Sequence, residues 1–225
     1  MLVGKIMTPN PVTVSPGASH RAAFELLRKH NISQLPVVEH GRLVGIVSEE
    51  DLLSTQPSPA TVLSIHEIYA LLEKLQVRQF MTRPVYTVEE DCPVEIAARI
   101  MLDRDLGCLP IMRGAELVGI LSVTDIFKVL VEVLGGDRPG LRFTVRVADT
   151  PGTLGKVAEA IYAAGGNIVS VVTWLPEGTP EYALTIKESG ADCDVLRDKL
   201  DAAGAELIEL YEGNGIMPGV FGVDD

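Results

Sequence analysis

The sequence predicts an α+β fold in which two copies of a β-α-β-β-α unit precede a smaller ferredoxin-like βαββαβ domain. Residues 3–53 align without a gap on residues 77–127, and 14 of these 51 pairs are identical. After the glycine-rich stretch 135–140 the repeat ends, and a single β-α-β-β-α-β pattern follows. A duplicated unit that buries a shared face predicts a pseudo-twofold pair.

Each repeat opens on a Met-Thr pair, followed by a short β segment at residues 12–14 and 86–88. An amphipathic helix comes next, because apolar residues recur at helical spacing. Two β runs then form a hairpin, at 35–38 and 43–47 in the first copy and at 109–112 and 117–121 in the second. A second helix starts at Ser48 and at Ser122. The helical apolar positions are Ala22, Ala23, Leu26 and Leu27, and Ile96, Ala97, Ile100 and Met101.

An insertion at residues 55–76 separates repeat one, 3–54, from repeat two, 77–134, within a predicted domain 1–134. It begins with the turn-rich stretch 55–59. The run Ser64-Ile65-His66-Glu67 has the form of a capping box and predicts a helix start. The apolar stripe of this helix is expected to pack on the repeats or on a second subunit. Its members are Ile65, Ile68, Leu71, Leu72 and Leu75.

Residues 135–140 are a predicted linker to a domain over 141–212, with a glycine-rich tail at 213–225. Alternating apolar residues predict a strand over 141–148. Further strands are expected at 167–175, 182–186 and 205–211. Helices are expected at 151–164 and 193–203, because glycines at 165 and 204 stop them.

Charge and hydropathy exclude several classes of partner. The chain has 19 basic and 31 acidic residues, a net charge of −12, and no basic stripe. Nucleic acid is therefore not an expected partner. No apolar run reaches the roughly 18 residues of a membrane span. The first residues, Met1–Lys5, lack the features of a signal peptide, and we expect a cytoplasmic protein.

The cysteines and histidines favour neither a disulfide framework nor a metal site. Three cysteines, at 92, 108 and 193, are widely spaced and fit a reducing cytosol. The histidines at 20, 30, 40 and 66 lack the spacing of a helical metal pair. We expect them at surface or boundary positions, and expect no metal or cofactor.

The strongest candidate site is the doubled motif Gly-h-h-Ser-x-x-Asp, where h is apolar, at 45–51 and 119–125. In one reading Ser48 and Ser122 simply cap helices. In the other, a helix N-terminus attracts phosphate, the serine donates to it, and Asp51 or Asp125 accepts from a ribose. The glycine would let a ligand approach the backbone. Thr13 and Thr87 would add hydroxyls. The two readings are compatible.

The paired Met-Thr openings, Leu-Pro strands and Gly-h-h-Ser-x-x-Asp ends resemble a tandem pair of CBS domains over about residues 3–134. The resemblance implies two clefts that bind adenine nucleotides or S-adenosylmethionine as regulatory ligands, with serine on phosphate and aspartate on ribose. No basic residue stands beside either serine, so AMP or ADP fits at least as well as ATP. The residues implied as nucleotide-binding are Thr13, Ser33, Gln34, Leu35, Ile46, Ser48 and Asp51, and Thr87, Gly107, Cys108, Leu109, Ile120, Ser122 and Asp125.

The C-terminal domain carries Asp149-Thr150-Pro151-Gly152-Thr153-Leu154, with Gly166-Asn167-Ile168 further along. A turn before a helix and a helix stop would explain each piece alone. In a βαββαβ frame they resemble an ACT domain, a family that dimerises and can bind amino acids between paired domains. The implied effector residues are Asp149, Gly152, Leu154, Asn167 and Ile168.

The order CBS–CBS–ACT, with its helical insertion, resembles the acetoin utilization protein AcuB family, which implies a regulatory role. No Walker loop, Gly-x-Ser-x-Gly or telling Cys/His pair indicates an enzyme. We therefore expect a non-catalytic, homodimeric sensor of small-molecule effectors that alters its contact with a partner protein. Two alternatives stay open: a structural dimeric interaction module with empty clefts, and a nucleotide-hydrolysing or deacetylase-linked enzyme.

Overall fold

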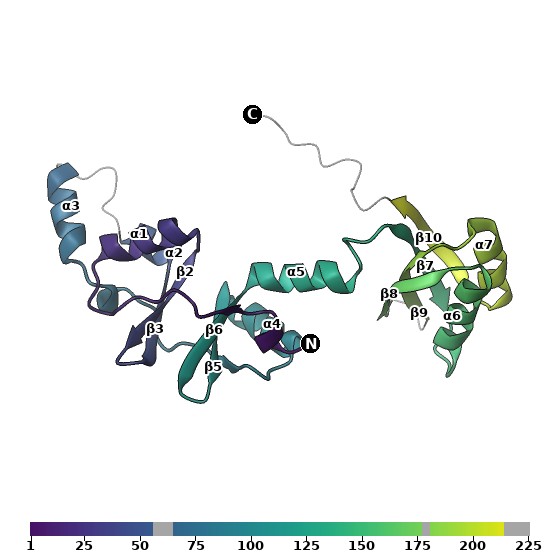
Figure 1. The fold of residues 1–225 in the computed structure, drawn as a ribbon, viewed down its shortest axis with the longest axis horizontal. Coiled ribbons are helices and arrows are strands. Elements are labelled where there is room, and N and C mark those ends of the chain that lie inside the picture. Colours follow the sequence, from purple (N-terminus) through teal and green to yellow (C-terminus); the bar gives the residue numbers. More distant parts are fainter. Residues whose placement is uncertain (56–64, 177–180, 214–225) are drawn as a thin grey trace. The chain divides into compact units, whose positions relative to one another are not determined.

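The computed structural model describes residues 1–55, 65–176 and 181–213, and it confirms the predicted α+β fold. The chain divides into two compact units, Met1–Phe127 and Lys128–Asp225 (Figure 1). The capping box at Ser64, the start of the predicted insertion and the C-terminal tail lie outside the described residues.

The first repeat is built on the hairpin of β2 and β3, which pairs in antiparallel register from Gln34↔Ser48 to Glu39↔Arg42. Helix α1 starts after Ser19, whose hydroxyl accepts from the Ala22 N–H at 3.2 Å. A helix, α3, is present in the insertion. The elements are η1 (Val3–Lys5), β1 (Thr8–Pro9), α1 (His20–His30), β2 (Gln34–Glu39), β3 (Arg42–Ser48), α2 (Glu49–Ser54) and α3 (Ile65–Lys74).

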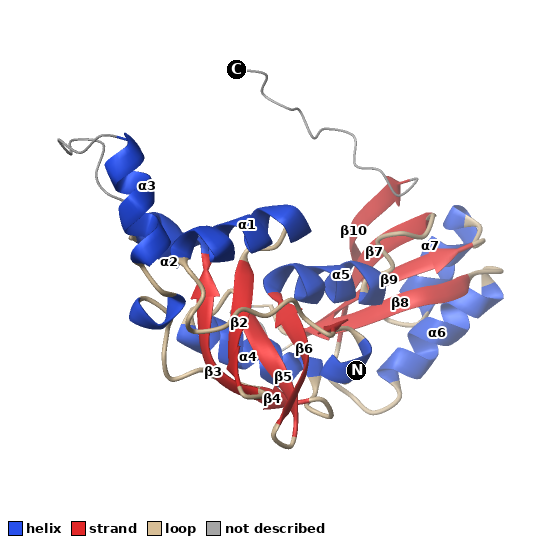
Figure 2. Ribbon diagram, turned by 60° about the vertical axis from the view of Figure 1, so that its left-hand side comes forward, coloured by secondary structure: helices blue, strands red, loops and turns tan. Residues whose placement is uncertain are grey.

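The second repeat has the same order, with hairpin β5–β6 in the register Cys108↔Ser122 to Arg113↔Glu116. Strand β3 contacts β6 where the two hairpins meet, and Figure 2 shows the two hairpins next to each other. The elements are η2 (Val77–Gln79), β4 (Val88–Glu89), α4 (Val94–Arg104), β5 (Cys108–Arg113), β6 (Glu116–Ser122) and α5 (Val123–Val133).

The β segments expected at 12–14 and 86–88 are shorter than predicted. Val14 makes only an isolated parallel bridge to Val37, and β4 begins at Val88. Prolines at 11, 16 and 84 lack the N–H that would extend the pairing.

The opening segments of the two repeats cross over. Thr8 pairs with Ile120 of the second hairpin, and Thr82 pairs with Ile46 of the first. Val3 is buried in the core of repeat two, with Leu109 and Leu121. Val77 and Met81 are buried in the core of repeat one. Each repeat is therefore completed by the other, which explains why the sequence carries them as a pair.

The second unit is a ferredoxin-like sheet in the order β10-β7-β9-β8, antiparallel throughout. Helices α6 and α7 pack on one face over a core that includes Phe143, Ile161 and Leu200. The elements, all close to their predicted positions, are β7 (Gly140–Val147), α6 (Thr153–Ala163), β8 (Asn167–Trp174), β9 (Tyr182–Ser189), α7 (Cys193–Ala202) and β10 (Glu206–Gly213).

The predicted linker is held against the ACT-like sheet at its first residues. The buried Lys187 donates from Nζ to the Gly135 carbonyl at 2.7 Å, and the Ser170 hydroxyl donates to the Leu134 carbonyl at 3.0 Å. These carbonyls follow the C-terminus of α5, where a cation is favourable. Lys187 thus has a polar partner for a charge that is only 8% exposed.

Candidate functional site

Site one is the junction of β3 and α2, where Ser48 and Asp51 form a capping box. The Ser48 hydroxyl donates to Asp51 Oδ2 at 2.7 Å, and the Ser48 N–H donates to the same oxygen at 2.7 Å. The Asp51 N–H donates back to Ser48 Oγ at 3.1 Å. Both hydrogen bonds that the Asp51 carboxylate accepts from Ser48 therefore end on Oδ2.

Site two, at the junction of β6 and α5, repeats this pattern. The Ser122 hydroxyl and N–H donate to Asp125 Oδ2 at 2.6 and 3.0 Å, and the Asp125 N–H donates to Ser122 Oγ at 3.3 Å. The capping interpretation of the motif is thus correct for both copies. The two carboxylates are also held in place by these bonds, so that each helix start presents a fixed anionic group.

The predicted wall residues lie beside these boxes. The first N–H of α2, at Glu49, donates to the Ser33 carbonyl at 2.9 Å, and the first N–H of α5, at Val123, donates to the Gly107 carbonyl at 3.2 Å. In the hairpins, Gln34 pairs with Ser48 and Cys108 pairs with Ser122. The structure therefore brings together Ser33, Gln34, Ser48 and Asp51 at site one, and Gly107, Cys108, Ser122 and Asp125 at site two.

Strand register shows which side chains share the face that carries the serine. Side chains alternate along a strand, and directly paired residues lie on the same side. Ile46 is two residues before Ser48 and pairs with Pro36 and Thr82, so these three share its face. The matching residues of site two are Ile120, Pro110 and Thr8. We call each set the site face.

Thr13 and Thr87 belong to the edge of this arrangement. Thr13 precedes Val14, which bridges to Val37 of β2. Thr87 precedes Val88, which pairs with Ile111 of β5. Val37 and Ile111 point into the cores, so alternation directs the two threonines to the opposite side. Both are exposed. Among the hydrogen bonds of the described residues, none joins Thr13 or Thr87 to a Ser/Asp box.

Leu35 and Leu109 do not line the sites with their side chains. Both are 0% exposed and belong to the cores of repeats one and two. They stand between the site-face residues of β2 and β5, and alternation turns them inward. The 0% exposure includes their backbone atoms, so neither residue is accessible to a ligand in this structure.

The repeated glycines have a different role from the predicted one. A Cβ on Gly45 would collide with the side chain of Met81, and a Cβ on Gly119 would collide with that of Met7. Each methionine comes from the other repeat. The glycine therefore admits a crossing methionine into the core, and the expectation that it lets a ligand approach the backbone is wrong.

Thr8 and Thr82 are site-face residues that the sequence reasoning missed. Both are exposed, and each reaches the site of the other repeat through the crossover. The available signal was their identity at matching positions of the two repeats. The register across the crossover, which alone assigns them to a site, is a tertiary feature.

The two sites differ in accessibility. Asp125 is only 7% exposed, whereas Asp51 is half-buried. Cys108 is buried where site one has the half-buried Gln34, and burial raises the pKa of its thiol to about 12. The Gln34 amide nitrogen lies 3.1 Å from where a Cβ on Gly107 would stand, so the walls of the two sites touch. Site one is the more open.

One of the histidines differs from its expected surface or boundary position. His20 is 2% exposed and not a surface residue, while His30 and His40 are exposed as predicted. Within the described ranges, no group of three His, Cys, Asp or Glu side chains is arranged to hold a metal. None of the three cysteines forms a disulfide. None of the described helices has both the length and the apolar character needed to cross a membrane.

The implied effector residues of the second domain fall into two separate groups. Val147 pairs with Tyr182 at one end of the sheet, and Asp149, Gly152 and Leu154 follow directly after it. Asn167 pairs with Ser189 at the other end, next to Ile168. Strands of this length span roughly 20 Å. One ACT-like domain alone therefore does not bring the two groups together.

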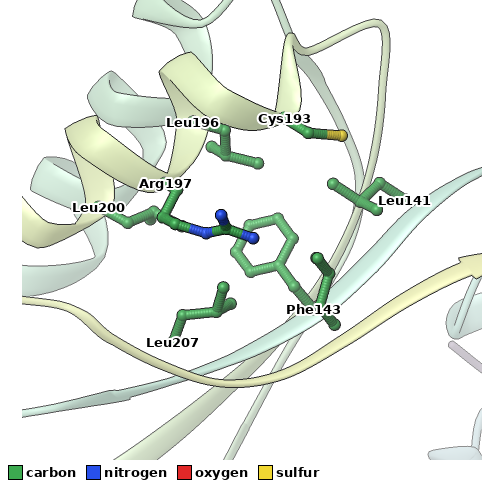
Figure 3. Close-up of a pocket in the computed structure, with 8 residues that line it drawn as sticks. Leu141, Phe143, Cys193, Leu196, Arg197, Leu200 and Leu207 are labelled. Atoms are coloured by element: carbon green, nitrogen blue, oxygen red, sulfur yellow. The ribbon is translucent and has the colours of Figure 1, made fainter.

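One small cavity lies inside this domain. This cavity, between α7 and strands β7 and β10, has a volume of about 10 Å³, close to the size of one water. Its lining is mostly apolar, with the Arg197 side chain extending across it (Figure 3). This cavity is too small for an amino acid.

Family comparisons agree with this architecture. The CBS domain model matches residues 3–58 and 77–132, and a TTHA0829-like ACT domain model matches residues 139–211.

Two archaeal relatives and one solved structure illustrate the similarity. The uncharacterized protein MJ1404 of Methanocaldococcus jannaschii is 34% identical over 140 residues, 60% of this chain and 33% of that protein. MJ1426 of the same organism is 31% identical over 155 residues, 58% of this chain and 92% of that protein. A crystal structure described as an acetoin utilization protein (AcuB) from Vibrio cholerae has a TM-score of 0.51 at 26% identity, covering 61% of this chain and 95% of that one.

The chain spans only part of several other relatives. It covers 33% and 23% of the length of the first two curated relatives it matches. Three matched relatives with enzyme names share only 21 to 31% of their length with it.

Proposed function

Because the chain belongs to the CBS-domain family and carries an ACT domain, we propose that it is a non-catalytic regulatory sensor whose CBS pair binds adenosine-containing ligands. The candidates are AMP, ADP, ATP and S-adenosylmethionine. The main support for this proposal is the doubled Ser/Asp box. In each box a carboxylate is fixed at a helix start beside a face of hydroxyl and apolar side chains.

The chemistry of the box suits a ribose. A ribose offers two neighbouring hydroxyl donors, and a carboxylate accepts charge-assisted hydrogen bonds worth about 1.5–3 kcal/mol. At site one the internal bonds use Oδ2 of Asp51, which directs a diol to Oδ1. The apolar Ile46 and Pro36 on the same face suit a purine ring. The box can therefore hold its helix and a ribose at once.

The composition of the site faces favours ligands of low charge. At site one the site face carries Pro36, Ile46 and Thr82, and Gln34 pairs with Ser48 beside it; none of these residues is cationic. A triphosphate would gain only neutral hydrogen bonds there. We propose AMP, ADP or S-adenosylmethionine over ATP, and tighter binding at the more open site one.

The ACT domain is proposed to dimerise and to bind an amino acid between two copies. The separation of the Asp149 group from the Asn167 group supports this, since a complete site needs one group from each of two domains. Binding at either domain would change contact with a partner protein, with a coupling of about 1–3 kcal/mol.

Isothermal titration calorimetry with the four adenosine ligands tests the nucleotide proposal. Saturable heat with at least one of them is expected. Absence of heat with all four, for protein shown to be folded and free of co-purified ligand, would refute it.

The alternative of a structural interaction module has an observation in its favour. Helix α5 exposes Phe127, Leu130 and Val133 at 60, 50 and 52%. Exposed apolar side chains on one helix are typical of surfaces that contact another protein. If the calorimetry fails, a concentration-dependent oligomer seen by analytical ultracentrifugation would favour this alternative.

A further inference from the structure

The helix that carries Asp51 has little of its own to hold it in place. Helix α2 has 6 residues, and Leu52 is its one buried side chain. Its counterpart at site two, α5, has 11 residues. A helix of less than two turns gains little from its internal hydrogen bonds, so its position depends on contacts with the rest of the fold.

His20 makes such a contact. Its Nε2 lies 2.8 Å from the carbonyl oxygen of Leu52, the residue directly after Asp51. A carbonyl only accepts, so Nε2 must carry the proton and donate it. The Thr55 hydroxyl donates to the same carbonyl at 2.9 Å. Thr55 is the C-cap residue of α2 itself, so of these two bonds the one from His20 ties the helix to another element, α1.

The His20 ring contacts two aromatic rings, and the His20 backbone is anchored as well. The ring stacks on Phe24 at a centroid distance of 6.5 Å and meets Phe80 at 5.8 Å. Its backbone N–H donates to the Leu75 carbonyl at 2.7 Å. Phe80 belongs to the segment that crosses from repeat two. A ring held in this way, and 2% exposed, can fix the position of what it bonds to.

We propose that His20 is a positioning residue for site one, which holds α2, and with it the Asp51 carboxylate, in place for the ligand. This role rests on the proposed function. The aligned position in repeat two is Val94, which has no hydrogen-bond donor in its side chain. The contact therefore belongs to site one alone, and site two serves as its control within the same molecule.

The test follows the amide signals of Asp51 and Asp125 by ¹⁵N NMR during a titration with AMP, which gives a dissociation constant for each site. His20→Leu should weaken binding at Asp51 by about three- to tenfold, the effect of losing one buried hydrogen bond. Binding at Asp125 should stay within about twofold. His20→Gln, whose amide can donate in the place of Nε2, should restore site one. Val94→Ala is the matched control.

Two results would overturn the role of His20. One is an equal loss at both sites, which indicates general destabilisation; the other is an unchanged constant at Asp51 in folded His20→Leu protein. A parallel measurement without ligand separates this role from the proposed function. Hydrogen exchange in α2 should speed up in His20→Leu while the first turn of α5 keeps its protection, even if AMP shifts neither amide in the unmutated protein.

Discussion

At the scale of single residues, the repeated glycine of each Gly-h-h-Ser-x-x-Asp motif packs against the repeated methionine of the other repeat's Met-Thr opening. Gly45 lacks the Cβ that would meet Met81, and Gly119 lacks the one that would meet Met7. The sequence shows all four residues as repeated identities. It does not show that they form pairs across the repeats, because that contact depends on the crossover.

A double-mutant cycle tests the Gly45–Met81 contact. Gly45→Ala should cost about 1–3 kcal/mol through overpacking. Met81→Ala should cost about 2–5 kcal/mol through a cavity. The double variant should be more stable than the sum of these losses by at least about 0.5 kcal/mol, since each change relieves the other. Urea unfolding gives the three values, and simple additivity would show that the two residues are not coupled.

Cys108 should be the least reactive of the three thiols. Burial raises its pKa from 9.0 to about 12, so it stays neutral in the folded protein at pH 8. Alkylation followed by peptide mass mapping should modify the exposed Cys193 first and Cys108 only on unfolding. Fast native labelling of Cys108 would contradict this placement.

The same raised pKa has a consequence for stability. The thiol is bound to its proton more tightly in the folded chain, so its contribution is complete below pH 9.0 and declines as the pH rises toward 12. Unfolding midpoints measured at pH 8 and pH 10 for the unmutated protein and Cys108→Ala should show a smaller pH dependence in the variant.

At the scale of elements, local pattern predicted most of the structure. The helical spacing of apolar residues predicted α1 and α4, and alternation predicted β7. The lengths of the two short β segments, 12–14 and 86–88, were overestimated. The flanking prolines have no backbone N–H to donate to a neighbouring strand, and β-propensity does not take this into account. The crossover could not be predicted, since exchanged and unexchanged openings have the same local sequence.

The crossover can be tested through Val3, which lies in repeat one by sequence and in the core of repeat two by packing. Val3→Ala should lower the hydrogen-exchange protection of β5 and β6 and leave β2 and β3 protected. Val77→Ala, at the matching position, should do the reverse. Loss of protection in the hairpin of the same repeat would mean that the openings are not exchanged.

At the scale of the whole molecule, the candidate site was predictable in its centre and not in its walls. Ser48, Asp51, Ser122 and Asp125 are where the motif placed them, because strand-to-helix junctions are local. Thr8 and Thr82 reach their sites only through tertiary pairing, and the inward turn of Leu35 and Leu109 follows from which face each hairpin buries. The molecule therefore carries two related candidate sites with different surroundings, joined to an ACT domain.

If each Ser/Asp box is a separate binding site for an adenosine ligand, the stoichiometry measured by calorimetry should show two sites per chain. Unmutated protein should bind AMP at two sites per chain. Asp51→Ala and Asp125→Ala should each lower the affinity of one of these sites by about 10- to 100-fold, so that one site remains measurable in each variant. The double variant should show no binding, with folding checked by circular dichroism. Undiminished binding in the double variant would show that the two boxes are not the binding sites.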